Sequence, residues 1–188
     1  MANPLYDNLI GKHATNDACF LRQPGKPTVS FRQFSERTSQ VANLLLKHGL
    51  KPGDRVAVQA SKTIEMVILY GATIQAGGVF LSLNTDYKKD EISYFIKDAS
   101  PKIFVCDPQK RIELEDIADQ VASQVLTLDK DGQGSLQSQA NMLSKTFNTI
   151  DRGPDDLVAL LYTSGTTGRS KGAMLTQNNL LSNAKTLK

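Results

Sequence analysis

The ten residues from 163 to 172, TSGTTGRSKG, have the composition of a loop that holds a polyphosphate. Their three glycines allow the backbone to turn tightly and bring N–H groups close to an anion. Hydroxyl side chains add directional hydrogen-bond donors, and an arginine and a lysine add positive charge. The sequence therefore predicts a phosphate-binding loop. The residues assigned to it are Thr163, Ser164, Gly165, Thr166, Thr167, Gly168, Arg169, Ser170 and Lys171.

This loop differs from the Walker A loop of many nucleotide-binding proteins. Lys171 stands between Ser170 and Gly172, whereas a Walker A lysine follows a glycine and precedes a serine or threonine. The apolar runs on either side, residues 157–162 and 173–175, are typical of buried strands. We therefore expect the loop to join two strands rather than to open a helix. A glycine-rich hairpin without a ligand is the alternative that its composition leaves open.

The sequence YTSGTTGRSKGAML, residues 162–175, resembles the phosphate-binding signature of the adenylate-forming superfamily. That superfamily includes acyl-CoA synthetases, luciferases and the adenylation domains of peptide synthetases. Residues 69–85 resemble its second recurrent segment, in which a buried helix passes through a glycine turn into a strand. Over nearly its whole length the chain is most similar to the malonyl-CoA synthetases within the acyl-CoA synthetase family.

Three positions depart from the pattern of these relatives. Most of the superfamily has proline where this chain has Ser170, and the family usually has proline at Ser82 and often histidine at Gln177. The change at Ser170 leaves the hydrogen-bond donors of the loop in place. The other two positions carry none of the implied chemistry, although Gln177 bears on how the following helix is held.

The resemblance implies an acid–thiol ligase that uses ATP, Mg²⁺, coenzyme A and a carboxylic acid, with malonate the favoured acid. The carboxylate attacks the α-phosphate of ATP, pyrophosphate leaves, and the thiol of coenzyme A then displaces AMP. In that scheme the loop grips the β- and γ-phosphates. Lys171 and Arg169 neutralise the charge of the leaving pyrophosphate, and Gly165 and Gly168 allow close approach. No other catalytic residue and no metal ligand is assigned in this chain.

The resemblance also implies that residues 1–188 are an incomplete N-terminal part of the large AMP-binding domain, without the small C-terminal domain. The adenine-binding segment, the metal-binding glutamate and the late catalytic lysine of the family have no counterpart in the sequence, and its acid pocket lies mostly downstream. We therefore expect the chain alone to be inactive as a ligase. If neighbouring strands are missing, the apolar run at residues 157–161 is uncovered, which favours self-association.

Other functions compete with this one. A non-catalytic nucleotide- or phosphate-binding module, such as a truncated gene product, is the main alternative. A phosphotransferase is disfavoured because no general base or second metal-ligand motif accompanies the loop. The SxxK pattern at residues 182–185 lacks the motifs that go with it in serine acyl-enzymes, and we expect it on a helix surface. Asp155 and Asp156 are expected to form a turn rather than to bind a metal.

Composition agrees with one domain of an enzyme. The 188 residues include 22 basic and 19 acidic side chains and are 40% hydrophobic, which suffices for a sizeable core. Basic residues are not interleaved with aromatics, so no nucleic-acid partner is expected. Cys19 and Cys106 have no CxxC partner, and we expect both to be reduced packing residues. With no basic, apolar leader and no run of about 18 apolar residues, the sequence predicts no membrane span and a cytoplasmic location.

Strands and helices alternate along the chain. Strands are expected at residues 18–22, 28–30, 54–60, 79–83, 102–107 and 125–128, and helices after Ser30, after Ser61 and over residues 92–99 and 114–122. Ser30 with Gln33 fits a capping box, and Gly77 with Gly78 ends the second helix. Residues 130–145 are expected to be a surface excursion. The alternation predicts an α/β fold, a mostly parallel sheet with flanking helices, which agrees with the N-terminal part of the large domain of an adenylate-forming enzyme.

Overall fold

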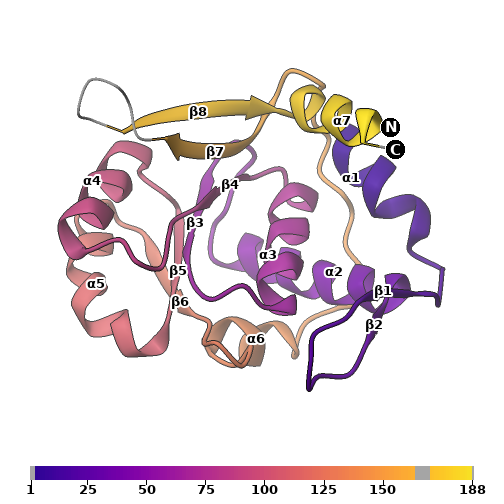
Figure 1. Cartoon of the computed structure of the whole chain (residues 1–188), viewed down its shortest axis with the longest axis horizontal. Helices are drawn as coiled ribbons and strands as arrows, with labels where there is room; N and C mark the ends of the chain where they lie inside the picture. The colour runs from indigo at the N-terminus through magenta and orange to yellow at the C-terminus, as the bar shows by residue number, and fades with distance from the viewer. Residues whose placement is uncertain (1–2, 164–169, 188) are drawn as a thin grey trace.

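The computed structural model describes residues 3–163 and 170–187, and these residues form an α/β fold (Figure 1). The helices are α1 (Pro4–Leu9), α2 (Phe31–Lys47), α3 (Ile64–Gln75), α4 (Lys89–Ala99), α5 (Arg111–Asp119), α6 (Ser135–Ala140) and α7 (Gln177–Thr186), with the short 3-10 helices η1 (Gly11–His13) and η2 (Pro108–Lys110). The strands are β1 (Cys19–Leu21), β2 (Val29–Ser30), β3 (Arg55–Gln59), β4 (Val79–Ser82), β5 (Ile103–Cys106), β6 (Gln124–Thr127), β7 (Leu157–Thr163) and β8 (Lys171–Thr176). The predicted α/β class is confirmed.

Six strands form the central sheet in the order β6-β5-β3-β4-β7-β8. The pairs β6–β5, β5–β3, β3–β4 and β4–β7 are parallel, and the outer pair β7–β8 is antiparallel. Strands β1 and β2 form a separate antiparallel pair. The mostly parallel sheet predicted from the alternation of strands and helices is therefore confirmed.

Helices cover both faces of the sheet. Figure 1 shows α2 and α3 on one side and α4 and α5 on the other. Because successive residues of a strand point to opposite faces, Val56 and Val58 of β3 pack with the α2–α3 side, and Ala57 between them packs with the α4–α5 side. All three are fully buried. Burial on both faces explains why this strand is apolar along its length instead of alternating with polar residues.

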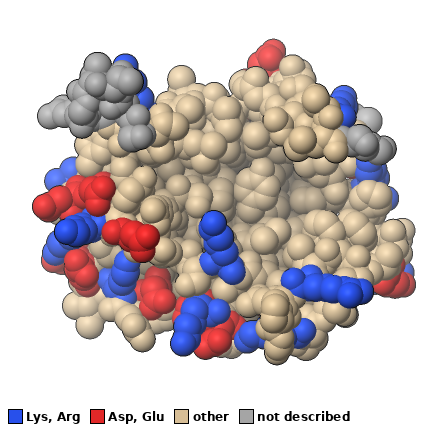
Figure 2. All heavy atoms as spheres, viewed as in Figure 1, with Lys and Arg blue, Asp and Glu red and all other residues tan. Residues whose placement is uncertain are grey.

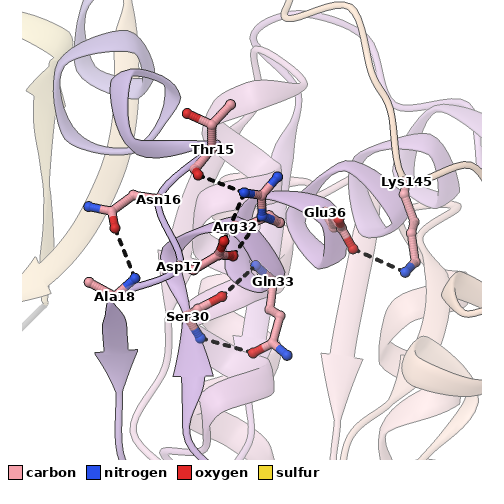
Figure 3. A network of polar contacts seen from close by, with 9 residues as sticks. All are labelled: Thr15, Asn16, Asp17, Ala18, Ser30, Arg32, Gln33, Glu36 and Lys145. Atoms are coloured by element: carbon pink, nitrogen blue, oxygen red, sulfur yellow. Dashed lines mark hydrogen bonds and ion pairs between the residues drawn. The ribbon is translucent and has the colours of Figure 1, made fainter.

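Helix α2 begins with the predicted capping box (Figure 3). The Ser30 hydroxyl accepts the Gln33 N–H at 3.2 Å, and the Gln33 side-chain oxygen accepts the Ser30 N–H at 3.0 Å. These bonds satisfy two of the backbone groups at the helix start. Beside the box, the Arg32 guanidinium donates to both carboxylate oxygens of Asp17 at 2.6 and 2.9 Å, which ties the segment before β1 to the first turn of α2.

Helices α4 and α5 begin at Lys89 and Arg111, three residues before the starts predicted from the sequence, and two further boundaries are also wrong. Helix α3 is capped by Thr63, whose hydroxyl accepts the Met66 N–H at 3.2 Å, and not by Ser61. Residues 60–63 instead form the connection from β3 to α3. Helix α5 ends at Asp119 instead of residue 122, and Ala122 has a φ of 53°, in the left-handed region that stops a helix.

The expected surface excursion at residues 130–145 contains a helix that packs into the core. Leu136 and Ala140 of α6 are each 1% exposed and join the apolar cluster of α2, α3 and the sheet. The Asn43 side chain of α2 donates to the Thr146 carbonyl at 2.9 Å and fixes the segment after α6. The sequence prediction failed because two buried apolar side chains in a polar segment are too weak a helical pattern.

The first helix packs against the last one, a contact that the sequence analysis did not predict. The Leu5 N–H donates to the Gln177 side-chain oxygen at 2.9 Å, and Gln177 is 1% exposed. The Asn3 amide donates to the Ile74 carbonyl at 2.8 Å. Figure 1 shows α1 beside α7. Gln177, which departs from the family pattern, therefore helps to hold α1 in place.

The two cysteines are both free thiols in different surroundings. Cys106, at the end of β5, is fully buried, and burial raises its pKa to about 11. The packing role predicted for it is confirmed. Cys19 in β1 is exposed, and its sulfur accepts a hydrogen bond from Arg22 at 3.3 Å. The packing role predicted for Cys19 is wrong because β1 belongs to the small separate pair of strands and not to the central sheet.

We predict that Gly134→Ala destabilises the fold strongly. Gly134 precedes α6 with a φ of 142°, and a Cβ at this position would lie 2.2 Å from the Thr127 carbonyl oxygen. The backbone strain alone costs roughly 1–3 kcal/mol, and the clash adds to it. Urea unfolding measures the difference. Gly153→Ala is the control because the atom nearest its added Cβ is 3.7 Å away. Equal stability of the two variants would contradict the prediction.

The outer strand pair exposes apolar side chains. Met174 on β8 is 65% exposed and Leu161 on β7 is 45% exposed. In Figure 2 the charged side chains lie mainly along the left, lower and right edges of the view, and the top centre, where Figure 1 shows β7 and β8, carries few of them. An apolar outer strand is a template for pairing with another chain. The self-association expected from the sequence stays a prediction.

We expect the chain to form dimers or larger species in concentrated solution and Met174→Lys to shift it toward monomer. A lysine on an outer strand opposes strand pairing between chains. Sedimentation velocity measures the distribution of species. Met142→Lys is the matched control, since Met142 is 77% exposed and follows α6 rather than lying on the sheet. A monomeric wild-type chain would refute the prediction.

Candidate phosphate-binding site

The carboxyl ends of three strands meet at one edge of the sheet. Strand β4 pairs in parallel with β3 on one side and with β7 on the other. The last residues of these strands, Gln59, Ser82 and Thr163, therefore lie along the same edge. In open parallel sheets, ligands bind outside this edge. The predicted phosphate loop leaves the sheet here, directly after β7.

The antiparallel hairpin β7–β8 carries the predicted loop. Its pairing extends to Thr163 opposite Lys171, and the Thr163 hydroxyl donates to the Lys171 carbonyl at 3.5 Å. The prediction that the loop joins two strands is confirmed. Lys171 is exposed and Ser170 is half-buried. The other residues assigned to the site lie outside the described residues, and their phosphate-binding role stays a prediction: Ser164, Gly165, Thr166, Thr167, Gly168 and Arg169.

Helix α4 contacts both sides of this hairpin where it meets the loop, at the end of β7 and directly before β8. The Tyr162 hydroxyl, next to the end of β7, donates to a carboxylate oxygen of Asp98 at 2.5 Å. The Tyr94 hydroxyl donates to the carbonyl of Ser170, directly before β8, at 3.0 Å. Tyr94 and Asp98 are four residues apart, so they lie on one face of α4.

An aromatic cluster supports these two hydrogen bonds. The Phe95 ring lies 4.5 Å from the Tyr162 ring, 5.4 Å from Tyr94 and 5.0 Å from Tyr87, measured between ring centroids. Phe95 itself is 2% exposed. Phe95 lies within the helix predicted from the sequence at residues 92–99, but no role was predicted for Tyr94 or Asp98. The spacing of four residues between Tyr94 and Asp98 indicates that they share one face of the helix. It does not indicate their partners, which lie 76 and 64 residues away in the sequence.

The Tyr162 hydroxyl stays protonated well into the alkaline range. Burial raises the pKa of Tyr162 above its ordinary value, and the hydrogen bond to Asp98 and the negative charge of that carboxylate raise the pKa further. A neutral hydroxyl is the form that donates to a carboxylate. The Tyr162–Asp98 hydrogen bond is therefore intact at neutral pH.

A pocket of about 550 Å³ opens at the same edge, between the ends of β3 and β4. It is lined by residues 60–62 and 66 after β3, by Ser82 at the end of β4 and by residues 83–85 after β4. The chain leaves β3 toward α3 on one face and leaves β4 toward α4 on the other, and neighbouring connections that diverge in this way commonly frame a ligand site. The sequence analysis gave this pocket no role, because only the strand order brings its two walls together.

The competing motifs take the structural roles that were expected. Asp156 accepts the Gly153 N–H at 2.7 Å in the turn before β7, so the predicted turn is confirmed. The SxxK pattern lies on α7 with Ser182 and Lys185 exposed, which confirms a helix surface. Within residues 3–163 and 170–187, no group of three His, Cys, Asp or Glu side chains could hold a metal ion.

None of the helices within residues 3–163 and 170–187 is long and apolar enough to cross a bilayer.

The sequence was compared with protein families and with characterised proteins. The profile of the family described as AMP-binding enzyme matches residues 11–188. Tyrocidine synthase 2 from Brevibacillus parabrevis is 37% identical over 147 residues, which cover 78% of this chain and 4% of the synthase. The matched region is thus a small part of a much longer relative.

Solved structures of MatB from Rhodopseudomonas palustris have the same fold. The apo structure is 49% identical to this chain, superposes with a TM-score of 0.96 and is matched over 100% of this chain and 37% of that chain. The ATP-bound structure gives the same identity, coverage and TM-score. The chain therefore spans little more than a third of the length of MatB and has the fold of that part.

We predict that the stability of the chain falls less steeply at alkaline pH when Tyr162 is replaced by phenylalanine. An unfolded tyrosine ionises at a pH of about 10, and above this pH the unfolded chain loses a proton that folded Tyr162 keeps. The free energy of unfolding therefore falls as pH rises toward the raised pKa. Tyr162→Phe removes this titration.

Urea unfolding of both proteins between about pH 9 and 11 measures the two slopes. The pKa values of Tyr6, Tyr70 and Cys106 are also raised by burial, but these groups are present in both proteins and cancel in the comparison. Parallel curves for the wild type and Tyr162→Phe would contradict the prediction.

Proposed function

Since this chain belongs to the AMP-binding enzyme family, we propose that it is the N-terminal part of an ATP-dependent, AMP-forming acyl-CoA ligase that acts on malonate. The observation that carries the proposal is the β7–β8 hairpin, which presents the predicted phosphate signature at the carboxyl edge of a parallel sheet. The likeness to ATP-bound MatB, 49% identical over the whole chain, supports ATP as the nucleotide.

The proposed reaction has two steps. In the first, an oxygen of the acid forms a bond to the α-phosphorus of ATP, and the bond from that phosphorus to pyrophosphate breaks. In the second, the sulfur of coenzyme A attacks the acyl carbon, the thiol proton is released and AMP leaves. Negative charge grows on the pyrophosphate during the first step, so a cation beside the β- and γ-phosphates lowers the barrier.

The residues of this chain act on the leaving group. Lys171, with Arg169 two residues before it in sequence, supplies the positive charge at the terminal phosphates. The Thr163 hydroxyl is held at the end of β7, and with the other hydroxyls of the loop it orients the phosphates by hydrogen bonds. Mg²⁺ is proposed to enter with ATP, and coenzyme A is proposed as the second substrate.

The identity of the acid substrate and the catalytic activity of the isolated chain are separate parts of the proposal. Malonate is proposed from similarity of sequence, and the 37% identity to tyrocidine synthase 2 makes an amino acid the acid to test against it. The chain spans 37% of the length of MatB. We therefore further propose that the chain alone binds ATP without turning it over, as the second candidate function, a nucleotide-binding module, also requires.

We predict that Lys171→Ala weakens binding of ATP far more than binding of AMP. Its charge is assigned to the terminal phosphates, and a charged hydrogen bond contributes about 1.5–3 kcal/mol, or about 10- to 150-fold in affinity. Titration calorimetry with both nucleotides measures the two losses. Lys185→Ala is the matched control because Lys185 is also exposed but lies on α7.

Equal losses of affinity for ATP and AMP would contradict the assignment of Lys171 to the terminal phosphates. A wild-type chain that binds neither ATP nor inorganic triphosphate would refute the proposed function as a whole. A loss of affinity in Lys185→Ala would show that general surface charge, and not the hairpin, governs binding.

The ligase proposal is tested by turnover. The purified chain with ATP, Mg²⁺ and malonate should release no pyrophosphate above the level without acid. A hybrid in which this chain replaces the matching part of MatB should release pyrophosphate in response to malonate, more than in response to acetate or a free amino acid, and Lys171→Ala should reduce that release. A hybrid that binds ATP without acid-dependent turnover would favour the non-catalytic module.

A further inference from the structure

We infer that Tyr94 and Asp98 of α4 are positioning residues for the phosphate hairpin, which they hold through Ser170 and Tyr162. The assignment of the hairpin to a triphosphate rests on the proposed function. The restraint of the hairpin by α4 rests on contacts between described residues and stands independently of it.

The two contacts reach opposite strands of the hairpin. Asp98 accepts from the Tyr162 hydroxyl at 2.5 Å, one residue before the end of β7. Tyr94 donates to the Ser170 carbonyl at 3.0 Å, one residue before β8 begins. The restraint therefore acts on both strands where the chain enters and leaves the predicted loop.

Helix α4 is a firm anchor for these contacts. Its inner face is formed by Ile92, Phe95 and Ile96, each 2% exposed or less. At its C-terminal end the Arg55 guanidinium of β3 donates to the Ala99 carbonyl at 2.6 Å. Packing and this hydrogen bond tie α4 to the centre of the sheet. The hydrogen bonds of Tyr94 and Asp98 hold the outer hairpin against this fixed helix.

The hairpin needs an external restraint because β8 is the outer strand. β8 pairs with β7 on one side, and no strand of the described residues pairs with its other side. Lys171 is its first residue and is exposed. The direction of a long exposed cation depends on the backbone that carries it. A hydrogen bond to the residue directly before Lys171 therefore restrains where its charge is placed.

Loss of the α4 contacts should weaken binding of the terminal phosphates selectively. Loss of either α4 contact loosens the end of β7 or the start of β8 without removing a phosphate-binding group. Affinity for inorganic triphosphate and ATP should fall, while affinity for AMP, which lacks the β- and γ-phosphates, should stay the same. A substitution that merely destabilised the whole fold would weaken both.

The experiment compares Tyr94→Phe, Asp98→Asn, Tyr162→Phe and the double variant of Tyr162 and Asp98 with the wild-type 188-residue chain. We expect each single variant to bind inorganic triphosphate about three- to tenfold more weakly with unchanged affinity for AMP. The double variant should lose no more affinity than Tyr162→Phe alone, because Asp98→Asn removes the charge of the acceptor and so weakens the same hydrogen bond that Tyr162→Phe removes. Tyr87→Phe is the matched control, since its ring packs on Phe95 but the two contacts to the hairpin do not involve it.

Hydrogen exchange provides a second readout that needs no ligand. Amides of β8 should exchange faster in Tyr94→Phe and Asp98→Asn than in the wild type, while those of β5 stay unchanged as an internal reference. Unchanged exchange in β8, or equal losses of affinity for triphosphate and AMP, overturns the inference. If the wild-type chain binds no triphosphate, the proposed function fails and the exchange of β8 alone decides the inference.

Discussion

Parallel pairing of β3 with both β4 and β5 forces the chain to cross over the sheet after each strand, and these crossovers set the rest of the arrangement. The first crossover places α3 on one face, and the second places α4 on the other. Because β3 lies between two helix layers, it is apolar on both faces and fully buried at Val56, Ala57 and Val58. The polar residues of the sheet are thereby displaced to the strand ends, where a site can form.

The same constraint determines what surrounds the phosphate hairpin. β7 joins the sheet beside β4 in the parallel sense, so its carboxyl end lies at the edge where the β3 and β4 connections diverge. β8 then returns antiparallel and brings Lys171 opposite Thr163. Helix α4 crosses from β4 to β5 on one face of the sheet, and its outward tyrosine and aspartate meet the hairpin there. A loop, a pocket and a supporting helix at one edge thus follow from one strand order.

Sequence predicted the parts of this arrangement that depend on local pattern. The capping box of Ser30 and Gln33, the apolar run of β7 and the glycine turn before β4 are each encoded within a few residues, and all were found. The burial of α6 was missed because Leu136 and Ala140 gain their role only from packing against α2. The contacts of Tyr94 and Asp98 were missed for a similar reason, as 76 and 64 residues separate the partners of those hydrogen bonds.

Ser170 shows how a local restraint and a tertiary one can serve the same position. Most of the superfamily has proline there, and proline fixes φ through its own ring. Serine leaves φ free, but the carbonyl of Ser170 accepts a hydrogen bond from Tyr94 at 3.0 Å. The restraint on the residue before Lys171 therefore comes from α4 instead of from the residue itself. Since proline keeps its carbonyl, the two restraints are compatible, and the orientation of the hairpin in this chain depends more on α4 than a proline-bearing hairpin would.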